Sequence, residues 1–66
     1  MKNRLKIERA IANLTQGELA EKIGVSRQTI NAIEAGKFVP STVLALKLSR
    51  LFSKSVNEIF DLEEGD

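Results

Sequence analysis

The stretch that decides the fold runs from Thr15 to Lys37 and reads TQGELAEKIGVSRQTINAIEAGK. Its apolar residues recur at helical spacing in two short segments, residues 16–23 and 27–35, which only the three residues GVS separate. Gly24 permits a tight turn after the first segment, because glycine adopts the left-handed backbone conformation without steric strain. Val25 then places an apolar side chain between the two segments. The pattern predicts a helix-turn-helix.

Residues that cap helices mark where each of these two helices begins. Thr15 is a favourable N-cap, and Glu18 follows three residues later, so the two side chains can form a capping box. Ser26 can cap the second helix, and Gly36 follows the end of that helix. Local signals alone therefore predict both helices and the turn between them.

The rest of the chain carries three further helical segments. The first covers about residues 3–13, a fourth helix capped by Ser41 ends near Phe52, and a short fifth helix covers about residues 56–60. We expect a single all-α domain over residues 1–66. The predicted core consists of aliphatic side chains from all these segments: Leu5, Leu14, Leu19, Ala20, Ile23, Val25, Ile30, Ile33, Leu44, Leu48 and Leu51.

The two ends of the chain could add a pair of short β-strands to the helices. Residues 1–5 and 60–64 could pair as a small two-stranded ribbon. That pairing would place Lys2 or Arg4 across from Asp61 or Glu63, and opposite charges on facing strands attract each other.

The absence of two residue types excludes several kinds of site. The chain has no Cys and no His, so disulfide frameworks, thiol nucleophiles, zinc clusters and imidazole bases are absent. We therefore expect neither an enzyme nor a metal or cofactor site. No segment approaches the roughly 18 apolar residues of a membrane span, and the N-terminal stretch lacks the apolar centre of a signal peptide. The default expectation is a cytoplasmic protein.

The net charge of +1 hides an uneven distribution of charge. Residues 1–57 contain ten basic and four acidic side chains, a net charge of +6, whereas residues 58–66 contain five acidic and no basic ones, a net charge of −5. A basic body suggests a surface that faces a polyanion, and we expect the acidic end to lie far from that surface. The alternative is that the acidic end is simply a solvated tail.

The exposed face of the second helix of the motif carries side chains suited to contact bases. Arg27 can donate two hydrogen bonds to guanine O6 and N7, while Gln28 and Asn31 can each bond adenine N6 and N7. Gln28 alone would be no more than an exposed polar residue. All three lie on one helical face near the helix N-terminus, which favours insertion of this helix into a DNA major groove.

Groups that can hold phosphates surround this face. Gln16 lies in the first turn of the preceding helix, where free backbone N–H groups also favour anions. Ser26 and Thr29 can donate hydroxyl hydrogen bonds, although Ser26 serves first as a cap. Lys37 follows the helix and should reach the flanking backbone. These contacts would set register and affinity without specifying the sequence.

The same residues resemble a known family. The stretch from Thr15 to Lys37, the proline before the fourth helix and the run VNEIF at residues 56–60 resemble the Cro/phage-repressor type of helix-turn-helix regulators, the Xre family. The resemblance covers about residues 3–60 and is typical of minimal single-domain members. It implies a compact five-helix, lambda-repressor-like domain, in which the residues that approach DNA are Gln16, Ser26, Arg27, Gln28 and Asn31.

The resemblance also concerns charged residues that face inward. It implies an ion pair between Arg9 and Glu34, joining the first and third helices as part of the scaffold. One position departs from the family, which commonly has Leu or an aromatic residue where this chain has Glu8. We expect either a slight rotation of the first helix or a contact of Glu8 with the charges of Arg4 and Arg9.

The fourth helix is more apolar than one buried stripe requires, because apolar residues cover more than half of its circumference. Exposed apolar side chains on so small a chain would form a patch. We expect a two-fold symmetric dimer interface there, the alternative being scattered surface aliphatics. The residues assigned to the interface are Val43, Leu46, Phe52, Val56 and Ile59.

These observations predict a sequence-specific regulator of transcription that binds double-stranded DNA as a homodimer, at a palindromic operator. We expect a repressor that associates with the nucleoid when bound to DNA, because no separate activation or ligand domain is evident. No small-molecule ligand is expected. The alternative is an antitoxin or adaptor module that acts mainly through protein–protein contacts made by the fourth helix and the acidic end.

Overall fold

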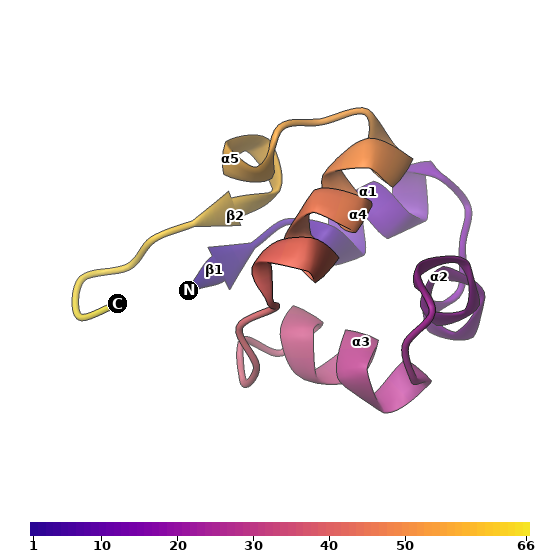
Figure 1. Cartoon of the computed structure of the whole chain (residues 1–66), viewed down its shortest axis with the longest axis horizontal. Helices are drawn as coiled ribbons and strands as arrows, with labels where there is room; N and C mark the ends of the chain where they lie inside the picture. The colour runs from indigo at the N-terminus through magenta and orange to yellow at the C-terminus, as the bar shows by residue number, and fades with distance from the viewer.

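Five helices and one pair of short strands follow one another along the chain (Figure 1), and the computed structural model describes all 66 residues. Helix α3 runs along the lower edge of the molecule in Figure 1, with α2 beside it and the two termini at the left. In chain order the elements are β1 (Lys2–Asn3), α1 (Leu5–Ile11), α2 (Gln16–Ile23), α3 (Arg27–Glu34), α4 (Thr42–Phe52), α5 (Val56–Ile59) and β2 (Phe60–Asp61).

Short polar side chains start four of the five helices. The hydroxyls of the residues before α2, α3, α4 and α5 each accept a hydrogen bond from the third residue of the helix they precede, which confirms the caps predicted for α2, α3 and α4. Capping boxes form at α2, between Thr15 and Glu18, and at α5, between Ser55 and Glu58. Helix α1 differs, because it begins at Leu5 rather than near residue 3. There the side-chain oxygen of Asn3 accepts from the Leu5 N–H at 3.1 Å.

The core draws side chains from all five helices and from β2. Its buried apolar residues are Leu5, Leu19, Ala20, Ile23, Ile30, Ile33, Leu44, Leu48, Ile59 and Phe60. Burial of each large aliphatic side chain contributes about 1.5–3 kcal/mol before the cost of ordering the chain is counted. Leu14 and Val25 are partly buried and pack against this core.

The predicted core was wrong at one position and incomplete at two. Leu51 remains 37% exposed, because the face of α4 that packs inward carries Leu44 and Leu48. Ile59 and Phe60, which were not predicted as core residues, are 0% and 5% exposed. The last helix and strand therefore close the core.

The terminal ribbon exists, although it is shorter than the segments proposed for it. Strands β1 and β2 are antiparallel, with Lys2 opposite Asp61 and Asn3 opposite Phe60. Arg4 extends the pairing, because its N–H donates to the Ile59 carbonyl at 2.8 Å. Its guanidinium also lies 2.8 Å from the Asp61 carboxylate. The charge pairing suggested by the sequence is thus present across the ribbon.

Candidate nucleic-acid interface

The turn between α2 and α3 depends on the backbone of Gly24. This residue has φ +83°, and its N–H and that of Val25 both donate to the Ala20 carbonyl, at 2.8 and 3.0 Å. A Cβ atom at Gly24 would have no neighbouring atom within 4 Å, so a larger side chain would not clash. Glycine is favoured here by its positive φ, because other L-residues adopt this backbone conformation at a cost in energy. The tight turn sets α3 directly after α2.

Helix α3 divides into an apolar face and a polar one. Ile30 and Ile33 point into the core and are at most 1% exposed. The three predicted base-contacting side chains, Arg27, Gln28 and Asn31, are all exposed. Arg27 takes part in no ion pair, and no acidic residue lies in the first turn of α3. The amides of Gln28 and Asn31 and the unpaired guanidinium of Arg27 therefore lie together on the exposed face of α3, toward the positive end of the helix dipole.

The predicted phosphate-contacting residues flank this polar face. Ser26 Oγ accepts from the Thr29 N–H at 3.2 Å and lies 3.0 Å from Thr29 Oγ1, so the two hydroxyls form one polar group at the start of α3. Lys37 is exposed just beyond the other end of α3, where its N–H donates to the Ala32 carbonyl at 2.9 Å. The two groups lie at opposite ends of the helix.

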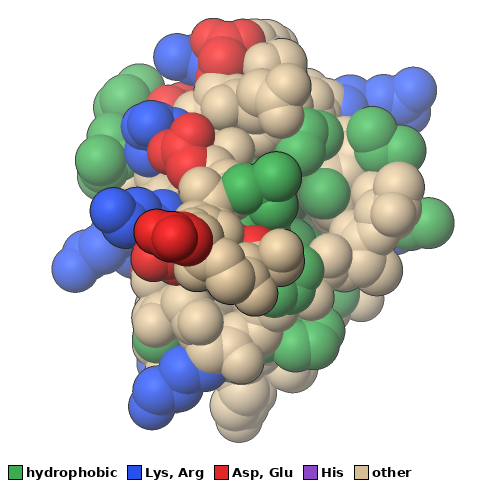
Figure 2. Space-filling model, turned by 90° about the vertical axis from the view of Figure 1, so that its left-hand side faces the viewer, with side chains coloured by type: hydrophobic (Ala, Val, Ile, Leu, Met, Phe, Trp, Pro, Cys, Tyr) green, Lys and Arg blue, Asp and Glu red, His purple; other side chains and the backbone are tan.

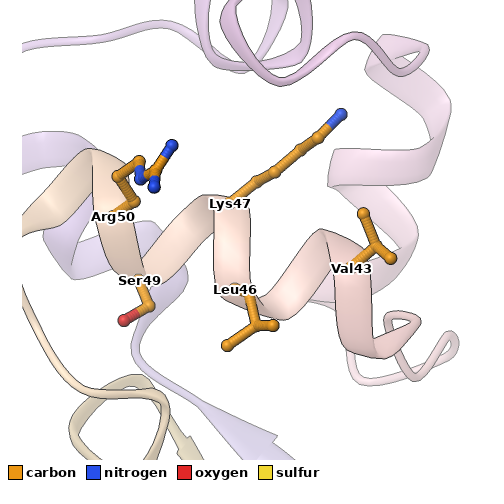
Figure 3. A pocket seen from close by; sticks show the side chains of 5 residues that line it. All are labelled: Val43, Leu46, Lys47, Ser49 and Arg50. Atoms are coloured by element: carbon orange, nitrogen blue, oxygen red, sulfur yellow. The ribbon is translucent and has the colours of Figure 1, made fainter.

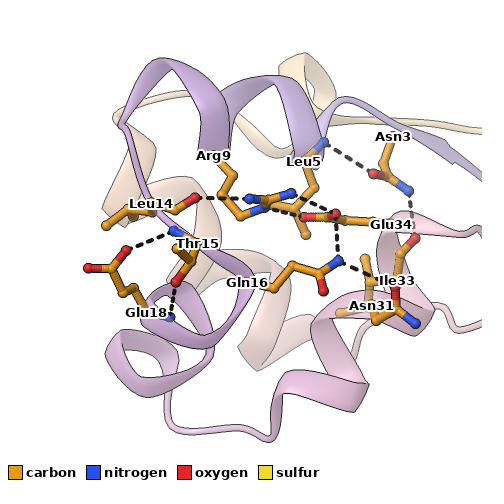
Figure 4. A network of polar contacts seen from close by, with 10 residues as sticks. All are labelled: Asn3, Leu5, Arg9, Leu14, Thr15, Gln16, Glu18, Asn31, Ile33 and Glu34. Atoms are coloured by element: carbon orange, nitrogen blue, oxygen red, sulfur yellow. Dashed lines mark hydrogen bonds and ion pairs between the residues drawn. The ribbon is translucent and has the colours of Figure 1, made fainter.

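An ion pair anchors α3 to α1 (Figure 4). Arg9 Nε donates to Glu34 Oε2 at 2.8 Å, and Arg9 Nη2 donates to Glu34 Oε1 at 3.3 Å. A third guanidinium nitrogen, Nη1, donates to the Leu14 carbonyl at 2.9 Å. The hydrogen bonds to Glu34 raise the pKa of Arg9 above its already high ordinary value. Both residues lie where the resemblance placed them, and they face inward.

Gln16 joins this ion pair to the exposed face of α3 (Figure 4). Its Nε2 donates to Glu34 Oε1 at 3.0 Å and to Asn31 Oδ1 at 3.3 Å. Both amide hydrogens of Gln16 are thus used within the protein. The backbone N–H groups of Gln16 and Gly17 lie in the first turn of α2, where a helix leaves its N–H groups without intrahelical acceptors. Those groups, rather than the side chain, are available to an anion.

Asn3 is a second anchor of α3 that sequence analysis missed. Its Nδ2 donates to the Ile33 carbonyl at 2.8 Å, while its Oδ1 accepts from the Leu5 N–H at the start of α1. One side chain therefore ties the C-terminal end of α3 to the ribbon and to α1. In the sequence Asn3 stands at the start of the first predicted helical segment, and nothing there indicates its partner on α3.

A family comparison agrees with this geometry. A family model described as helix-turn-helix matches residues 5–59, most of the chain. The chain belongs to the helix-turn-helix family of Xre-type transcriptional regulators. As a member of this family it is a DNA-binding regulator of transcription.

Three relatives of this helix-turn-helix regulator have nearly the same length. An uncharacterized HTH-type transcriptional regulator of Methanocaldococcus jannaschii is 53% identical over 66 residues, which are 100% of both chains. The uncharacterized HTH-type transcriptional regulator YgzD of Bacillus subtilis is 48% identical over 64 residues, 97% of each chain. Another, from Archaeoglobus fulgidus, is 45% identical over 66 residues, 100% of this chain and 93% of its own.

Glu8 occupies a buried position, and its partner is not one of the two arginines expected from the sequence. Its side chain is 10% exposed and lies 3.8 Å from the ammonium of Lys54, not beside Arg4 or Arg9. Lys54 follows α4, and its ammonium reaches across to the Glu8 carboxylate on α1.

One residue of the regulator's acidic end lies near the C-terminal end of α3. Glu63 lines the same surface hollow as Glu34 and Gly36, at the C-terminal end of α3. The amino group of Met1 lies 3.0 Å from Glu63 Oε1 and 3.2 Å from Asp66 Oδ2. Figure 2, which looks onto the end that carries the termini, shows acidic side chains among basic ones there. The ribbon causes this placement, because it carries the acidic segment back to the N-terminus.

The outer surface of α4 is mixed in character (Figure 3). Val43 and Leu46 are 64% and 57% exposed, and Lys47 and Arg50 extend to the side of the helix opposite Leu46. Of the other residues assigned to a dimer interface, Phe52 and Val56 are partly buried against the core. Ile59 has no exposed surface. Its assignment to the interface therefore does not fit the structure, and Ile59 is a core residue.

None of the five helices has both the length and the apolar character that crossing a membrane requires.

Proposed function

We propose that this regulator binds a palindromic DNA operator as a homodimer, inserts α3 into the major groove and represses transcription. The observation that carries the proposal is the exposed face of α3, on which Arg27, Gln28 and Asn31 stand together without acidic neighbours in the first turn. Arg27 and Gln28 make no side-chain hydrogen bond within the chain, and Asn31 makes one, from its Oδ1 to Gln16 Nε2. Contact with base edges accounts for all of them.

Each side chain of this face has a distinct part in the proposal. Arg27 donates two parallel hydrogen bonds to guanine O6 and N7, because its guanidinium is unpaired within the protein. Gln28 makes no hydrogen bond within the chain, so its amide is free to bond adenine N6 and N7. Asn31 contributes an amide one helical turn further on. Together they would contact adjacent base pairs.

Phosphate contacts would hold the helix in register on both sides of this face. The hydroxyls of Ser26 and Thr29 and the ammonium of Lys37 lie at opposite ends of α3. Free N–H groups at the start of α2, including that of Gln16, supply a further contact. Such contacts set affinity and its dependence on salt, whereas base contacts set specificity.

An apolar surface beside α4 supports the homodimer. Val39 and Leu46 are exposed and line a shallow hollow, the rest of which is mostly apolar: Met1, Pro40, Thr42, Ala45, Val56 and Phe60. Burying this hollow and Val43 against a second copy would remove apolar area from water. To contact two half-sites one turn of DNA apart, such a two-fold dimer must hold its two α3 helices roughly 34 Å apart.

In this proposal the regulator represses transcription by occupying its DNA site. A dimer that lies across two successive major grooves excludes other proteins from the same DNA face. Transcription in vitro from a promoter that overlaps the bound site should therefore decrease as the regulator is added. An increase would contradict the repressor role and leave DNA binding intact.

Selection of bound DNA from a random pool tests the DNA contacts. We expect enrichment of an inverted repeat whose half-sites lie about one helical turn apart. Enrichment of a single half-site would support α3 as the contacting helix but contradict binding as a dimer. No enrichment over competitor DNA would contradict sequence-specific binding and favour the alternative, a module that binds protein partners.

Sedimentation of two matched variants tests the dimer surface. Leu46→Ser should shift the protein toward monomer, because it removes an exposed apolar side chain from the hollow beside α4. Ile11→Ser makes the same change in character at a residue of α1 that is 73% exposed, and it should leave the oligomeric state unchanged. Equal behaviour of both variants and the parent chain would contradict the assigned surface.

A further inference from the structure

The N-terminal segment, residues 1–3, borders both the end of α3 and the hollow beside α4 that we assign to the dimer. Met1 lines that hollow together with Phe60, and Phe60 stands opposite Asn3 in the ribbon. On its other side the segment lies against the end of α3, because a Cβ atom at Gly36 would lie 3.9 Å from the Met1 carbonyl oxygen. The segment therefore connects the proposed dimer surface with the helix that faces DNA in our proposal.

The side chain of Asn3 makes this connection through two hydrogen bonds (Figure 4). Its Nδ2 donates to the Ile33 carbonyl at 2.8 Å, and its Oδ1 accepts from the Leu5 N–H at 3.1 Å. The Ile33 carbonyl also accepts from the Gly36 N–H at 2.9 Å, so both of its lone pairs are used. All other hydrogen bonds of the α3 backbone are made within residues 26–37.

The bond from Asn3 differs in kind from the other contacts that hold α3. Ile30 and Ile33 pack into the core through their side chains, and Glu34 bonds Arg9 through its carboxylate. A side chain can rotate about its own bonds and keep such a contact while its helix shifts. A backbone carbonyl moves with the helix, so the bond from Asn3 to Ile33 is lost when the end of α3 moves away from the ribbon.

The position of α3 relative to the dimer surface determines which operators a dimer can bind. Two α3 helices contact both half-sites only when their separation matches that of the half-sites on DNA. One base pair more or fewer between the half-sites changes their separation by about 3.4 Å and their relative rotation by about 35°. A dimer that binds such an operator through both α3 helices must move them relative to the dimer surface.

We propose that Asn3 is a positioning residue that holds α3 at a fixed orientation to the dimer surface and so confines the regulator to one spacing of half-sites. The inference rests on the proposed homodimer and palindromic operator. In the free chain and on a correctly spaced operator the bond from Asn3 to Ile33 is intact, so it does not change the affinity. On an operator with one base pair more or fewer it is broken, which lowers the affinity about two- to tenfold, the net contribution of one hydrogen bond.

Asn3→Ser removes this bond with little other change. The serine hydroxyl can still accept from the Leu5 N–H, because serine and asparagine are both favourable at helix starts, but it is too short to reach the Ile33 carbonyl. Asn57→Ser is the matched control, since Asn57 is exposed in α5 and lies outside both hollows. If Asn3→Ser does not fold, Asn3→Asp takes its place, because it keeps the size of the side chain and its acceptor and removes the donor.

The experiment begins with selection of bound DNA by the parent chain, which identifies the half-site and its preferred spacing. The affinities of the parent and the variants are then measured by titration of duplexes with that spacing and with one base pair more or fewer. In Asn3→Ser the preference for the correct spacing should fall about two- to tenfold, through tighter binding to the other duplexes. Affinity for the correctly spaced duplex should stay that of the parent. Asn57→Ser should keep the parent preference.

Each outcome decides this inference separately from the proposed function. No enrichment, or enrichment of a single half-site, with the parent chain would mean that the proposed function itself fails. An inverted repeat without a preferred spacing would overturn the role of Asn3 alone. An unchanged spacing preference in a folded Asn3 variant, with or without an equal loss of affinity for every duplex, would overturn it too. Urea denaturation and sedimentation, run beside the titrations, establish that the variant is folded and has the oligomeric state of the parent.

Discussion

Arg9 Nε lies 2.8 Å from Glu34 Oε2, and this contact joins the first helix of the chain to the end of the helix that faces DNA in our proposal. The two side chains are 16% and 7% exposed, so the pair is largely removed from water. The other guanidinium nitrogens bond Glu34 Oε1 and the Leu14 carbonyl. With its hydrogen bonds satisfied on both partners, the pair fixes the position of α3 relative to α1.

Removing one partner of this ion pair should lower the stability of the chain more than replacing both partners with apolar residues. Glu34→Ala leaves the Arg9 guanidinium in a mostly buried site without its carboxylate, and we expect the free energy of unfolding to fall by about 3–5 kcal/mol. The double variant Arg9→Met, Glu34→Leu removes both charges and should recover most of that loss. Urea denaturation of the three proteins measures the difference. A single variant as stable as the parent would contradict a structural role for the pair.

Glu8 is a buried carboxylate, and the nearest cation is not in close contact with it. Replacing Glu8 with an apolar residue should therefore stabilise the chain. Lys54 stands 3.8 Å away and is 42% exposed, which compensates little for burial of the carboxylate. We expect Glu8→Leu to raise the free energy of unfolding by about 1 kcal/mol. That corresponds to an increase in Tm of about 4–8 °C for a chain of this size. A lower Tm would mean that the Glu8–Lys54 contact outweighs the burial.

Local signals made α2, the turn and α3 predictable. Each helix boundary depends on residues within one or two turns of it. The structure has the capping hydroxyls of Thr15 and Ser26, the capping-box glutamate and the glycine of the turn at the positions predicted from the sequence. The ion pair of Arg9 and Glu34 was found through the family resemblance. Nothing in the sequence around Arg9 indicates that its partner is a glutamate 25 residues away.

Features that depend on the packed chain were not predictable in the same way. Leu51 and Leu48 have the same character in the sequence, and only the orientation of α4 on the core exposes one and buries the other. Ile59 was assigned to an interface because a short terminal helix gives no sign of which face packs inward. The partners of Gln16, Asn3 and Glu8 were missed because each contact joins elements that only the fold brings together.

Acid should destabilise the chain partly through its two capping boxes. Hydrogen bonds from the backbone N–H groups of Thr15 and Ser55 hold the pKa values of Glu18 and Glu58 below their ordinary value. A lowered folded pKa adds stability above the ordinary value, about 4.3, and that stability is lost as the pH falls through the folded pKa. The double variant Glu18→Gln, Glu58→Gln keeps the capping geometry without the titration. Its stability, measured from pH 7 to pH 2.5 by urea denaturation, should decline less than that of the parent.

Ile59 should behave as a core residue of the single chain. Its side chain is fully buried, so Ile59→Ala should lower the free energy of unfolding by about 2–5 kcal/mol through lost burial and the cavity that remains. Leu62→Ala is a matched control, because Leu62 is 82% exposed and its truncation should change stability by less than about 0.5 kcal/mol. Thermal unfolding of both variants measures the contrast. A stable Ile59→Ala would place this side chain outside the core.

Arg27 and Lys37 should differ in what their loss does to DNA binding. Arg27→Ala should cost about 1–3 kcal/mol at one base position and relax the preference there, because a guanidinium bonded to guanine O6 and N7 discriminates among bases. Lys37→Ala should weaken binding to all sequences alike and reduce the slope of log K against log salt by about one, because one phosphate contact is lost. Titration of the selected operator and a scrambled duplex, each at several salt concentrations, separates the two effects. Unchanged affinity and base preference in Arg27→Ala would mean that the exposed face of α3 does not contact bases.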